Sequence, residues 1–256
     1  MQAEGYACQE ITFSGNVHIK QIGHAIVHLD RWNEDYLIPL PNVKIAGLLT
    51  GSPYPELSGS YEIVSSGGYV SEIDFSGKRF LGMTGKKNQV HAAVYRLDDA
   101  SRRDPLYQVE GTWNGSFTIR NGGDQTVLET YDTTKDKPTP IRVPPLGEQD
   151  AWESRRAWSG VTKALDNGDM QTAAAEKSKV EQGQRDMRKH EETQNSTWTP
   201  KFFTREPSDV VFERLSRFIV GEQHTQDAAH GFWKFNAERA ETSSRPLYGS
   251  LRPDNR

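Results

Sequence analysis

Three two-residue turns constrain the fold of this chain more than any other feature of its sequence. Gly67-Gly68, Ser76-Gly77 and Asn114-Gly115 each stand between two short segments rich in β-branched and aromatic residues. Such pairs supply the positive φ angles that tight hairpins need. No long helical pattern interrupts the stretch from Ile11 to about Tyr131. The turns therefore predict an antiparallel β-meander there.

Side-chain alternation supports the same prediction. Two sets of residues alternate along positions 90–95: Val90, Ala92 and Val94 in one, His91, Ala93 and Tyr95 in the other. Successive side chains of a strand point to opposite faces, so the two sets suit a sheet with two different environments. We expect residues 1–132 to form the β-meander. Residues 133–147, rich in Thr, Lys and Pro, are expected to form an extended connector.

Residues 148–256 are predicted to form a helical subdomain that ends in a polar tail. Asp150 and Glu153 make a capping-box start for a first helix, which Asn167-Gly168 ends. Asp169 caps a second helix that runs to about Glu192. Apolar residues at helical spacing mark one face of the first helix and the inward face of a later short helix at 210–220. They are Trp158, Val161 and Leu165 in the first helix, and Val211, Leu215 and Phe218 in the later one.

Three charged residues stand four apart on the predicted second helix: Lys177, Glu181 and Arg185. Each step of four residues advances only about 40° around a helix, so the three share one narrow face. Such rows are common on solvated helices, where an ion pair contributes only about 0.3–0.5 kcal/mol. The row by itself leaves a binding role and a plain surface role open.

Composition excludes several classes of function. The chain carries 31 basic and 35 acidic residues, a net charge of −4, which argues against a nucleic-acid binder that works through general basicity. Cys8 is the single cysteine, so no internal disulfide can form and a reducing, cytoplasmic setting is expected. No apolar run approaches the roughly 20 residues that span a bilayer. The first five residues lack the pattern of a signal peptide. We expect any membrane contact to be transient and peripheral.

Motifs for metal binding and catalysis are weak or missing. His24 and His28 share one face of a predicted strand with Asp30 close by, but no fourth ligand is evident, so no metal is expected. The Gly- and Lys-rich stretch from Gly77 to Gly85 lacks the Gly-Lys-Ser/Thr ending of a P-loop. The sequence has no Gly-x-Ser-x-Gly elbow, and Cys8 has no obvious base nearby. We therefore expect neither an enzyme nor a bound cofactor.

Several longer segments carry a resemblance to a known family. The most specific are Glu153-Ser154-Arg155-Arg156-Ala157-Trp158, Lys163-Ala164-Leu165-Asp166-Asn167-Gly168-Asp169 and residues 177–185. Further segments are Gly5-Tyr6, Thr12-Phe13-Ser14-Gly15, Lys20-Gln21-Ile22-Gly23-His24, Gly51-Ser52-Pro53-Tyr54-Pro55-Glu56-Leu57, Phe75-Ser76-Gly77, Gly85-Lys86-Lys87-Asn88, Gly111-Thr112-Trp113, Pro200-Lys201-Phe202-Phe203 and Gly231-Phe232-Trp233-Lys234-Phe235. Together they resemble, in order and over nearly the whole chain, the lipid-transfer domain of the oxysterol-binding-protein-related family.

The resemblance implies both a fold and a function. The implied fold is mainly β with α: an incomplete antiparallel, barrel-like sheet followed by the C-terminal helical subdomain. The implied function is non-vesicular lipid transfer between membranes, in which a sterol or another lipid such as phosphatidylserine is exchanged for phosphatidylinositol 4-phosphate. The resemblance assigns Lys177, Glu181 and Arg185 to the phosphatidylinositol 4-phosphate headgroup, and places Gln21 in the lumen, where it reaches a sterol through water. A strand glutamine bonded to neighbouring backbone is the alternative for Gln21.

One departure from the family pattern shapes these expectations. The family signature Glu-Gln-Val-Ser-His-His-Pro-Pro does not occur in this sequence. In relatives it lies shortly before the segment that Gly5-Tyr6 resembles, so we expect the C-terminal part of the domain: a fragment, a chain whose true start lies upstream, or a truncated product. An incomplete barrel leaves strand edges unpaired, and such edges recruit partners or aggregate. The rival interpretation is therefore a non-binding fragment or a protein-interaction module.

Overall fold

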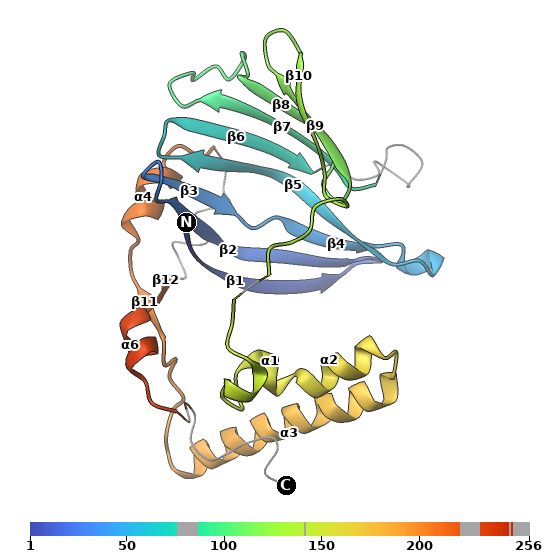
Figure 1. Ribbon diagram of the computed structural model, residues 1–256, viewed down its shortest axis with the longest axis vertical. Helices are drawn as coiled ribbons and strands as arrows, with labels where there is room; N and C mark the ends of the chain where they lie inside the picture. The colour runs from blue at the N-terminus through green and yellow to red at the C-terminus, as the bar shows by residue number, and fades with distance from the viewer. Residues whose placement is uncertain (76–86, 141, 221–230, 246, 248–256) are drawn as a thin grey trace. The chain divides into compact units, whose positions relative to one another are not determined.

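The computed structural model describes residues 1–75, 87–140, 142–220, 231–245 and 247. The chain divides into two compact units (Figure 1). The first unit comprises Met1–Lys137 and Thr204–Phe235, and the second comprises Pro138–Phe203 and Asn236–Arg256. The predicted Ser76-Gly77 turn, the stretch from Gly77 to Gly85 and most of the polar tail lie outside the described residues.

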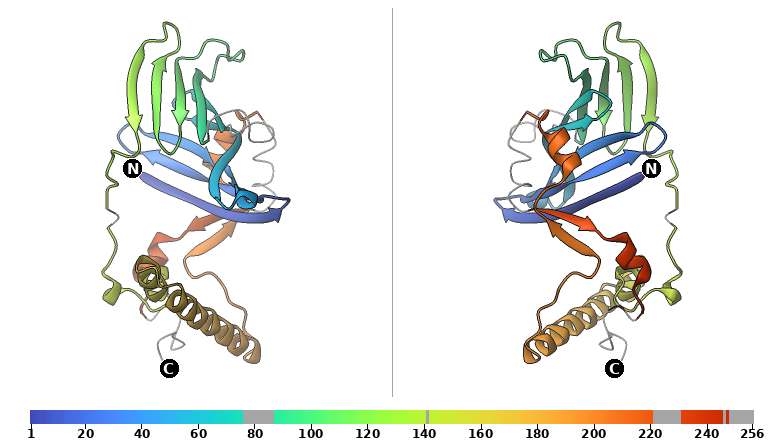
Figure 2. Two further views of the ribbon diagram at one scale, coloured as in Figure 1. Left: turned by 90° about the vertical axis from the view of Figure 1, so that its right-hand side faces the viewer. Right: turned by 90° about the vertical axis from the view of Figure 1, so that its left-hand side faces the viewer.

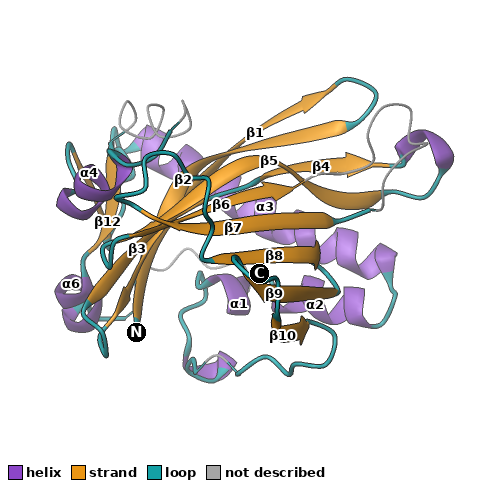
Figure 3. Cartoon of the chain, turned by 90° about the horizontal axis from the view of Figure 1, so that it is seen from above, coloured by secondary structure: helices purple, strands orange, loops and turns teal. Residues whose placement is uncertain are grey.

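An antiparallel sheet of ten strands forms most of the first unit (Figures 1 and 3). The strands are β1 (Gln2–Phe13), β2 (Val17–Leu29), β3 (Glu34–Pro39), β4 (Asn42–Ala46), β5 (Tyr54–Ser65), β6 (Tyr69–Phe75), β7 (Gln89–Arg96), β8 (Tyr107–Thr112), β9 (Ser116–Asn121) and β10 (Val127–Asp132). Their order is β1-β2-β3-β5-β6-β7-β8-β9-β10, and β4 pairs with β2 and β5 beside β3. Among the described strands, β1 and β10 are the sheet edges. The predicted mainly β chain with an antiparallel sheet is confirmed.

Two of the predicted turns close hairpins. Gly67-Gly68 joins β5 to β6, and Gly68 has a φ of 90°, which a residue with a Cβ rarely adopts. Asn114-Gly115 joins β8 to β9, where the amide of Gly115 donates to the carbonyl of Thr112. The dipeptide signals therefore located both turns correctly.

The core of the first unit lies between one face of the sheet and the helix α4 (Val210–Ser216). Phe212 and Leu215 of α4 are buried in one apolar cluster with Leu37, Val64, Val70, Tyr95 and Phe232. The prediction that Phe218 points inward is wrong, since 41% of it is exposed. The helix ends at Ser216, so helical spacing no longer governs residue 218, and Phe212 takes the buried position instead.

Asp209 sets where α4 begins. Its carboxylate accepts from the backbone N–H groups of Val211 and Phe212, each at 2.9 Å, and forms an ion pair with Lys234. Lys234 belongs to β12 (Phe232–Phe235), which pairs with β11 (Phe203–Glu206) in a separate two-stranded sheet. The N-cap thus fixes α4 to the strand that supplies Phe232 to the core.

The second unit is built on a helical hairpin of α2 (Ser159–Asp166) and α3 (Met170–Thr193), which lie side by side in both views of Figure 2. The short elements are η2 (Leu146–Glu148), α1 (Ser154–Ala157) and α6 (Ala237–Thr242). Asp169 caps α3 as predicted, by accepting from the amide of Thr172 at 2.9 Å. In the first unit, η1 (Leu48–Thr50) joins β4 to β5.

The expected first helix differs from the observed one. The capping box forms, since the amide of Asp150 donates to Glu153 at 2.9 Å, but the helix divides at Trp158 into α1 and α2. Trp158 and Leu165 are exposed by 39% and 50%, so the predicted apolar face is not the packed one. The buried residues of the hairpin are Ala164 of α2 and Ala173 and Val180 of α3 instead. The spacing of large apolar residues does not reveal that alanines are buried here.

Candidate functional site

The sheet face that points away from α4 carries an apolar band. The strand register places Tyr61, Ile73, Ala92, Val109 and Ile119 directly opposite one another across β5 to β9. Tyr61 is buried, and the other four are half-buried. Alternation keeps the charged neighbours of these residues on the opposite face.

A second row continues the band toward β1. Ile11, Ile19, Val43 and Leu57 are successive partners across β1, β2, β4 and β5. The band therefore spans the described sheet almost from edge to edge. An apolar surface with a few placed polar groups is what a lipid site requires.

Gln21 lies on this face, at the gap between β3 and β4. The backbone N–H of Gln21 donates to Asn42 Oδ1 at 2.9 Å, and its side-chain amide donates to the carbonyl of Pro41 at 2.5 Å. Neither β3 nor β4 pairs with β2 at this position. The hydrogen bonds of Gln21 thus replace the strand pairing that β2 lacks at this position. They agree with the alternative expectation for Gln21, that of a strand glutamine bonded to neighbouring backbone. Its luminal role stays a prediction.

The hydroxyl of Tyr61 also takes part in the hydrogen bonds at the gap between β3 and β4. The amide of Asn42 donates to Tyr61 Oη at 2.7 Å, and the hydroxyl donates to the carbonyl of Ser58 at 2.7 Å. Burial raises the pKa of Tyr61, so its hydroxyl stays protonated at neutral pH. Sequence reasoning did not single out Asn42 or Tyr61. The signal that could have found the gap is the Pro39-Leu40-Pro41 run, because Pro41 cannot donate to a ladder.

Lys177, Glu181 and Arg185 lie on α3 in the second unit, while Gln21 lies in the first. Lys177 forms an ion pair with Glu181 on an exposed face of the helix. The hydrogen bond from Lys177 and the charge of Arg185 hold the pKa of Glu181 below its usual range. Arg185 Nε donates to Gln182 Oε1 at 3.3 Å. The row therefore offers two cations held beside one carboxylate, which can meet a phosphate and its hydroxyl groups.

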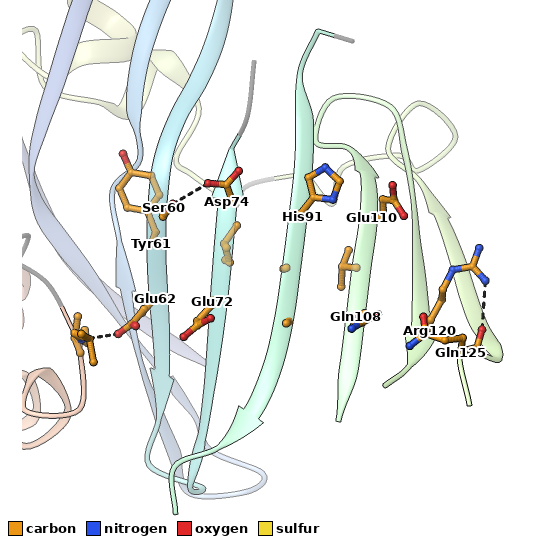
Figure 4. A pocket seen from close by; sticks show the side chains of 16 residues that line it. Ser60, Tyr61, Glu62, Glu72, Asp74, His91, Gln108, Glu110, Arg120 and Gln125 are labelled. Atoms are coloured by element: carbon orange, nitrogen blue, oxygen red, sulfur yellow. Dashed lines mark hydrogen bonds between the residues drawn. The ribbon is translucent and has the colours of Figure 1, made fainter. Parts of the chain in front are cut away.

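The opposite face of the sheet has a different chemistry (Figure 4). A cavity of about 640 Å³ has a mixed lining there, with charged and polar residues that include Asp74, Glu110 and Arg120. Its lining also includes Ile219 and Val220 after α4 and parts of the band residues Ile73, Ala92 and Val109. Ser60 donates to Asp74 at 2.7 Å, and the Val220 amide donates to Glu62 at 2.8 Å. Charged side chains such as Glu62, Glu72 and Asp74 line this cavity, so the uncharged band is the better candidate for a lipid site.

The His24, His28 and Asp30 set holds no metal-binding geometry. His24 is buried against the rings of Tyr6, Phe212 and Phe232, and His28 Nδ1 lies 2.8 Å from Asp35. No group of three or more His, Cys, Asp or Glu among the described residues could hold a metal ion. Within the same residues, no helix combines the length and apolar character that crossing a membrane requires.

Comparison with known proteins gives a consistent result. The sequence profile of the family described as oxysterol-binding protein matches residues 2–162 and 161–244. The chain is 54% identical over 255 residues to the probable transporter efuK of Hormonema carpetanum, covering 100% of this chain and 36% of that protein. It is 38% identical over 239 residues to the protein kes1 of Schizosaccharomyces pombe, covering 92% of this chain and 59% of that protein.

Solved structures show the same fold. A crystal structure of the Osh1 ORD domain with cholesterol matches with a TM-score of 0.61 at 20% identity, covering 93% of this chain and 58% of that chain. The Osh3 ORD with PI(4)P from Saccharomyces cerevisiae matches with a TM-score of 0.58 at 17% identity, covering 79% of this chain and 55% of that chain. The present chain therefore spans between 36% and 59% of the length of these relatives and solved structures.

Proposed function

The chain belongs to the oxysterol-binding protein family, and from that premise we propose that it binds a sterol or another lipid, binds phosphatidylinositol 4-phosphate, and transfers both between membranes. No covalent bond changes in this function, so the chain acts as a carrier and not as an enzyme. It works from the cytoplasm, with transient peripheral membrane contact and without a cofactor, a metal ion or nucleic acid.

The apolar band on the ten-stranded sheet is the observation that carries the proposal. Opposed partners from Tyr61 to Ile119 offer one continuous apolar surface across five strands, and four of these five residues are half-buried. Covering such a surface with a sterol gains roughly 25 cal/mol per Å² of apolar area removed from water. Gln21 and Tyr61 supply the few polar groups beside it.

The row on α3 is proposed to hold the headgroup phosphate. Lys177 and Arg185 supply the cations, and Glu181 positions them or accepts from inositol hydroxyls. This assignment rests on the segment resemblance, and the ion pair of Lys177 with Glu181 supports it by fixing one cation on the shared face. The second lipid is either a sterol or another lipid such as phosphatidylserine.

A protein-interaction module remains the second candidate. Exposed apolar side chains stand on both sheet edges, with Ile11 and Phe13 on β1 and Leu128 on β10. Unpaired edges of this kind recruit further strands. Extraction of neither lipid from liposomes by this chain would favour the module.

The headgroup assignment is tested by liposome extraction. Lys177→Ala or Arg185→Ala should weaken phosphatidylinositol 4-phosphate extraction about tenfold to a hundredfold, since each change removes a charge-assisted contact of about 1.5–3 kcal/mol. Uptake of a fluorescent sterol should fall much less, because a sterol carries no phosphate.

Lys179→Ala is the matched control for these changes. Lys179 lies on α3 about 200° around the helix from Lys177 and pairs with Glu176, so the variant makes the same charge change on another face. Equal loss of both lipids in the Lys177 and Arg185 variants, or equal effects of Lys179→Ala, would show that the row is ordinary helix surface.

A further inference from the structure

The apolar side chains at one end of the sheet are more exposed than a folded surface needs. Leu49 on η1 is 89% exposed, and Phe13 at the end of β1 is 72% exposed. Ile11 and Leu48 are exposed beside them, at 65% and 37%. We call these four residues the tip cluster.

The register brings the two halves of the tip cluster to the same end of the sheet. Phe13 pairs with Val17, Val17 pairs with Ile45 of β4, and Ile45 pairs with Pro55 of β5. The β1–β2 turn and the η1 connection from β4 to β5 are therefore neighbours. Figures 1 and 3 show both at the same end of the strands.

Charge is absent from the tip and gathers just behind it. Residues 11–19 and 45–55 contain no Asp, Glu, Lys or Arg. Behind them, Lys20 pairs with Glu10 at 3.6 Å, and Glu56 is buried. Lys44 stands beside the uncharged run, and Lys87 Nζ lies 3.7 Å from the centre of the Tyr54 ring. Lys20, Lys44 and Lys87 thus outnumber the one exposed carboxylate among these charges, Glu10.

We propose that the tip cluster is a membrane-docking surface that inserts into the interface of an anionic bilayer. Leucine and phenylalanine side chains gain free energy in the acyl boundary, while lysines behind them remain at the headgroups and attract anionic lipid. A protein partner would not require an uncharged tip backed by lysines. A lipid surface of negative charge fits both features.

The inference rests on the proposed function and adds the place where the carrier meets its membrane. Ile11 belongs both to the tip cluster and to the apolar band, through its pairing with Ile19 and on to Val43. A lipid that leaves the bilayer at the tip therefore meets continuous apolar surface leading onto the sheet. Docking at this end shortens the exposure of the lipid to water.

The test measures binding of the full chain to vesicles of phosphatidylcholine and phosphatidylserine that contain neither sterol nor phosphatidylinositol 4-phosphate. Leu49→Asp and Phe13→Asp should each weaken co-sedimentation about tenfold or more, because a charge replaces an inserted apolar group. Leu49→Phe should bind as the unchanged chain does. Binding should weaken in high salt, since salt screens the attraction between lysines and anionic lipid.

Trp32→Asp is the matched control. Trp32 is also exposed, at 61%, but it lies in the turn between β2 and β3, at the other end of β2. All of the substituted side chains are exposed, so each variant should still fold. Circular dichroism checks that it does. Unchanged vesicle binding in both tip variants, or equal loss with Trp32→Asp, would overturn the inference, as would failure of the unchanged chain to bind these vesicles.

Sterol binding in solution, without vesicles, separates this inference from the proposed function. Tip variants that lose vesicle binding and keep sterol binding support both. Loss of sterol binding in the unchanged chain, with tip-dependent vesicle binding intact, would reject the carrier and leave the docking surface standing. If the tip variants convert a dimer to a monomer in sedimentation and leave vesicle binding unchanged, the tip is a contact between copies and the inference fails.

Discussion

Asp209 shows how one buried carboxylate can join two elements. It caps α4 and pairs with Lys234 of β12, and its side chain is only 3% exposed. Burial opposes its ionisation, but Lys234 and the amide of Phe212 outweigh burial and hold the pKa of Asp209 below its usual value of 3.8. A carboxyl with a lowered folded-state pKa contributes stability that is present above its unfolded pKa and is lost as pH falls through the folded one.

We therefore predict that Asp209→Asn lowers the free energy of unfolding at pH 7 by about 1–3 kcal/mol. Asparagine still caps a helix, so the loss reports the ion pair with Lys234. Urea unfolding at several pH values should show the difference from the unchanged chain narrowing below about pH 4. A difference that is the same at pH 7 and in acid would contradict the assigned charge of Asp209.

Replacing Gln21 distinguishes a structural role of its side chain from a role in binding a sterol. Gln21→Ala removes the hydrogen bond to Pro41 and should cost about 1 kcal/mol of unfolding free energy. If the amide also reaches a bound sterol through water, sterol affinity should fall while phosphatidylinositol 4-phosphate extraction changes little. Gln9→Ala is the control, because Gln9 is the direct partner of Gln21 on β1. Lost stability with unchanged sterol affinity would leave Gln21 purely structural.

Side-chain spacing predicted some of these residue positions and missed others. The Lys177–Glu181 pair follows from helix geometry alone, since residues four apart meet on a helix surface. Phe212 was missed in favour of Phe218, because the sequence pattern does not show that α4 ends at Ser216. Asn42 was missed because its partners, Gln21 and Tyr61, are about twenty residues away on other strands.

At the level of elements, Arg102 fixes the chain after α4 to the sheet. Its guanidinium donates to Glu62 of β5, Glu72 of β6 and the carbonyl of Phe218. Glu62 in turn accepts from the amide of Val220 at 2.8 Å. Four polar contacts thus hold the end of one segment against two strands.

Arg102→Ala should lower the free energy of unfolding by about 2–3 kcal/mol, because it leaves two neighbouring carboxylates without their shared cation. Hydrogen exchange at the Val220 amide should accelerate more than exchange within β5. Arg103→Ala is the control, as Arg103 is the exposed next residue. Equal effects of the two changes would show that Arg102 does not anchor this segment.

The elements differ in how far local sequence predicts them. The Gly67-Gly68 and Asn114-Gly115 hairpins and the Asp169 cap are local, and the sequence located all three. The division of the first helix at Trp158, where φ is −95° and ψ is 4°, was not predicted. The gap between β3 and β4 is defined by pairing with β2 and β5.

For the whole molecule, the boundaries 1–132, 133–147 and 148–256 stay a prediction. The compact units group Thr204–Phe235 with the sheet, because Phe212, Leu215 and Phe232 join its core. Apolar spacing in that segment showed that it is buried. It could not show which part of the chain buries it, since long-range contact leaves no local pattern.

The last prediction concerns the ligand-free chain as a whole. The half-buried apolar band and the exposed edges should bind a hydrophobic dye strongly and make the chain prone to aggregate. A bound sterol covers the band, so dye fluorescence should fall as sterol is added. A ligand at a hundredfold over its Kd stabilises the folded state by about 2.7 kcal/mol, which raises the Tm by roughly 5–10 °C in a chain of this size. Differential scanning fluorimetry and dye titration measure both effects on one sample. A sharp monomeric melt with no dye binding, and no shift with sterol, would show that the band is already covered and would remove the main support for the carrier.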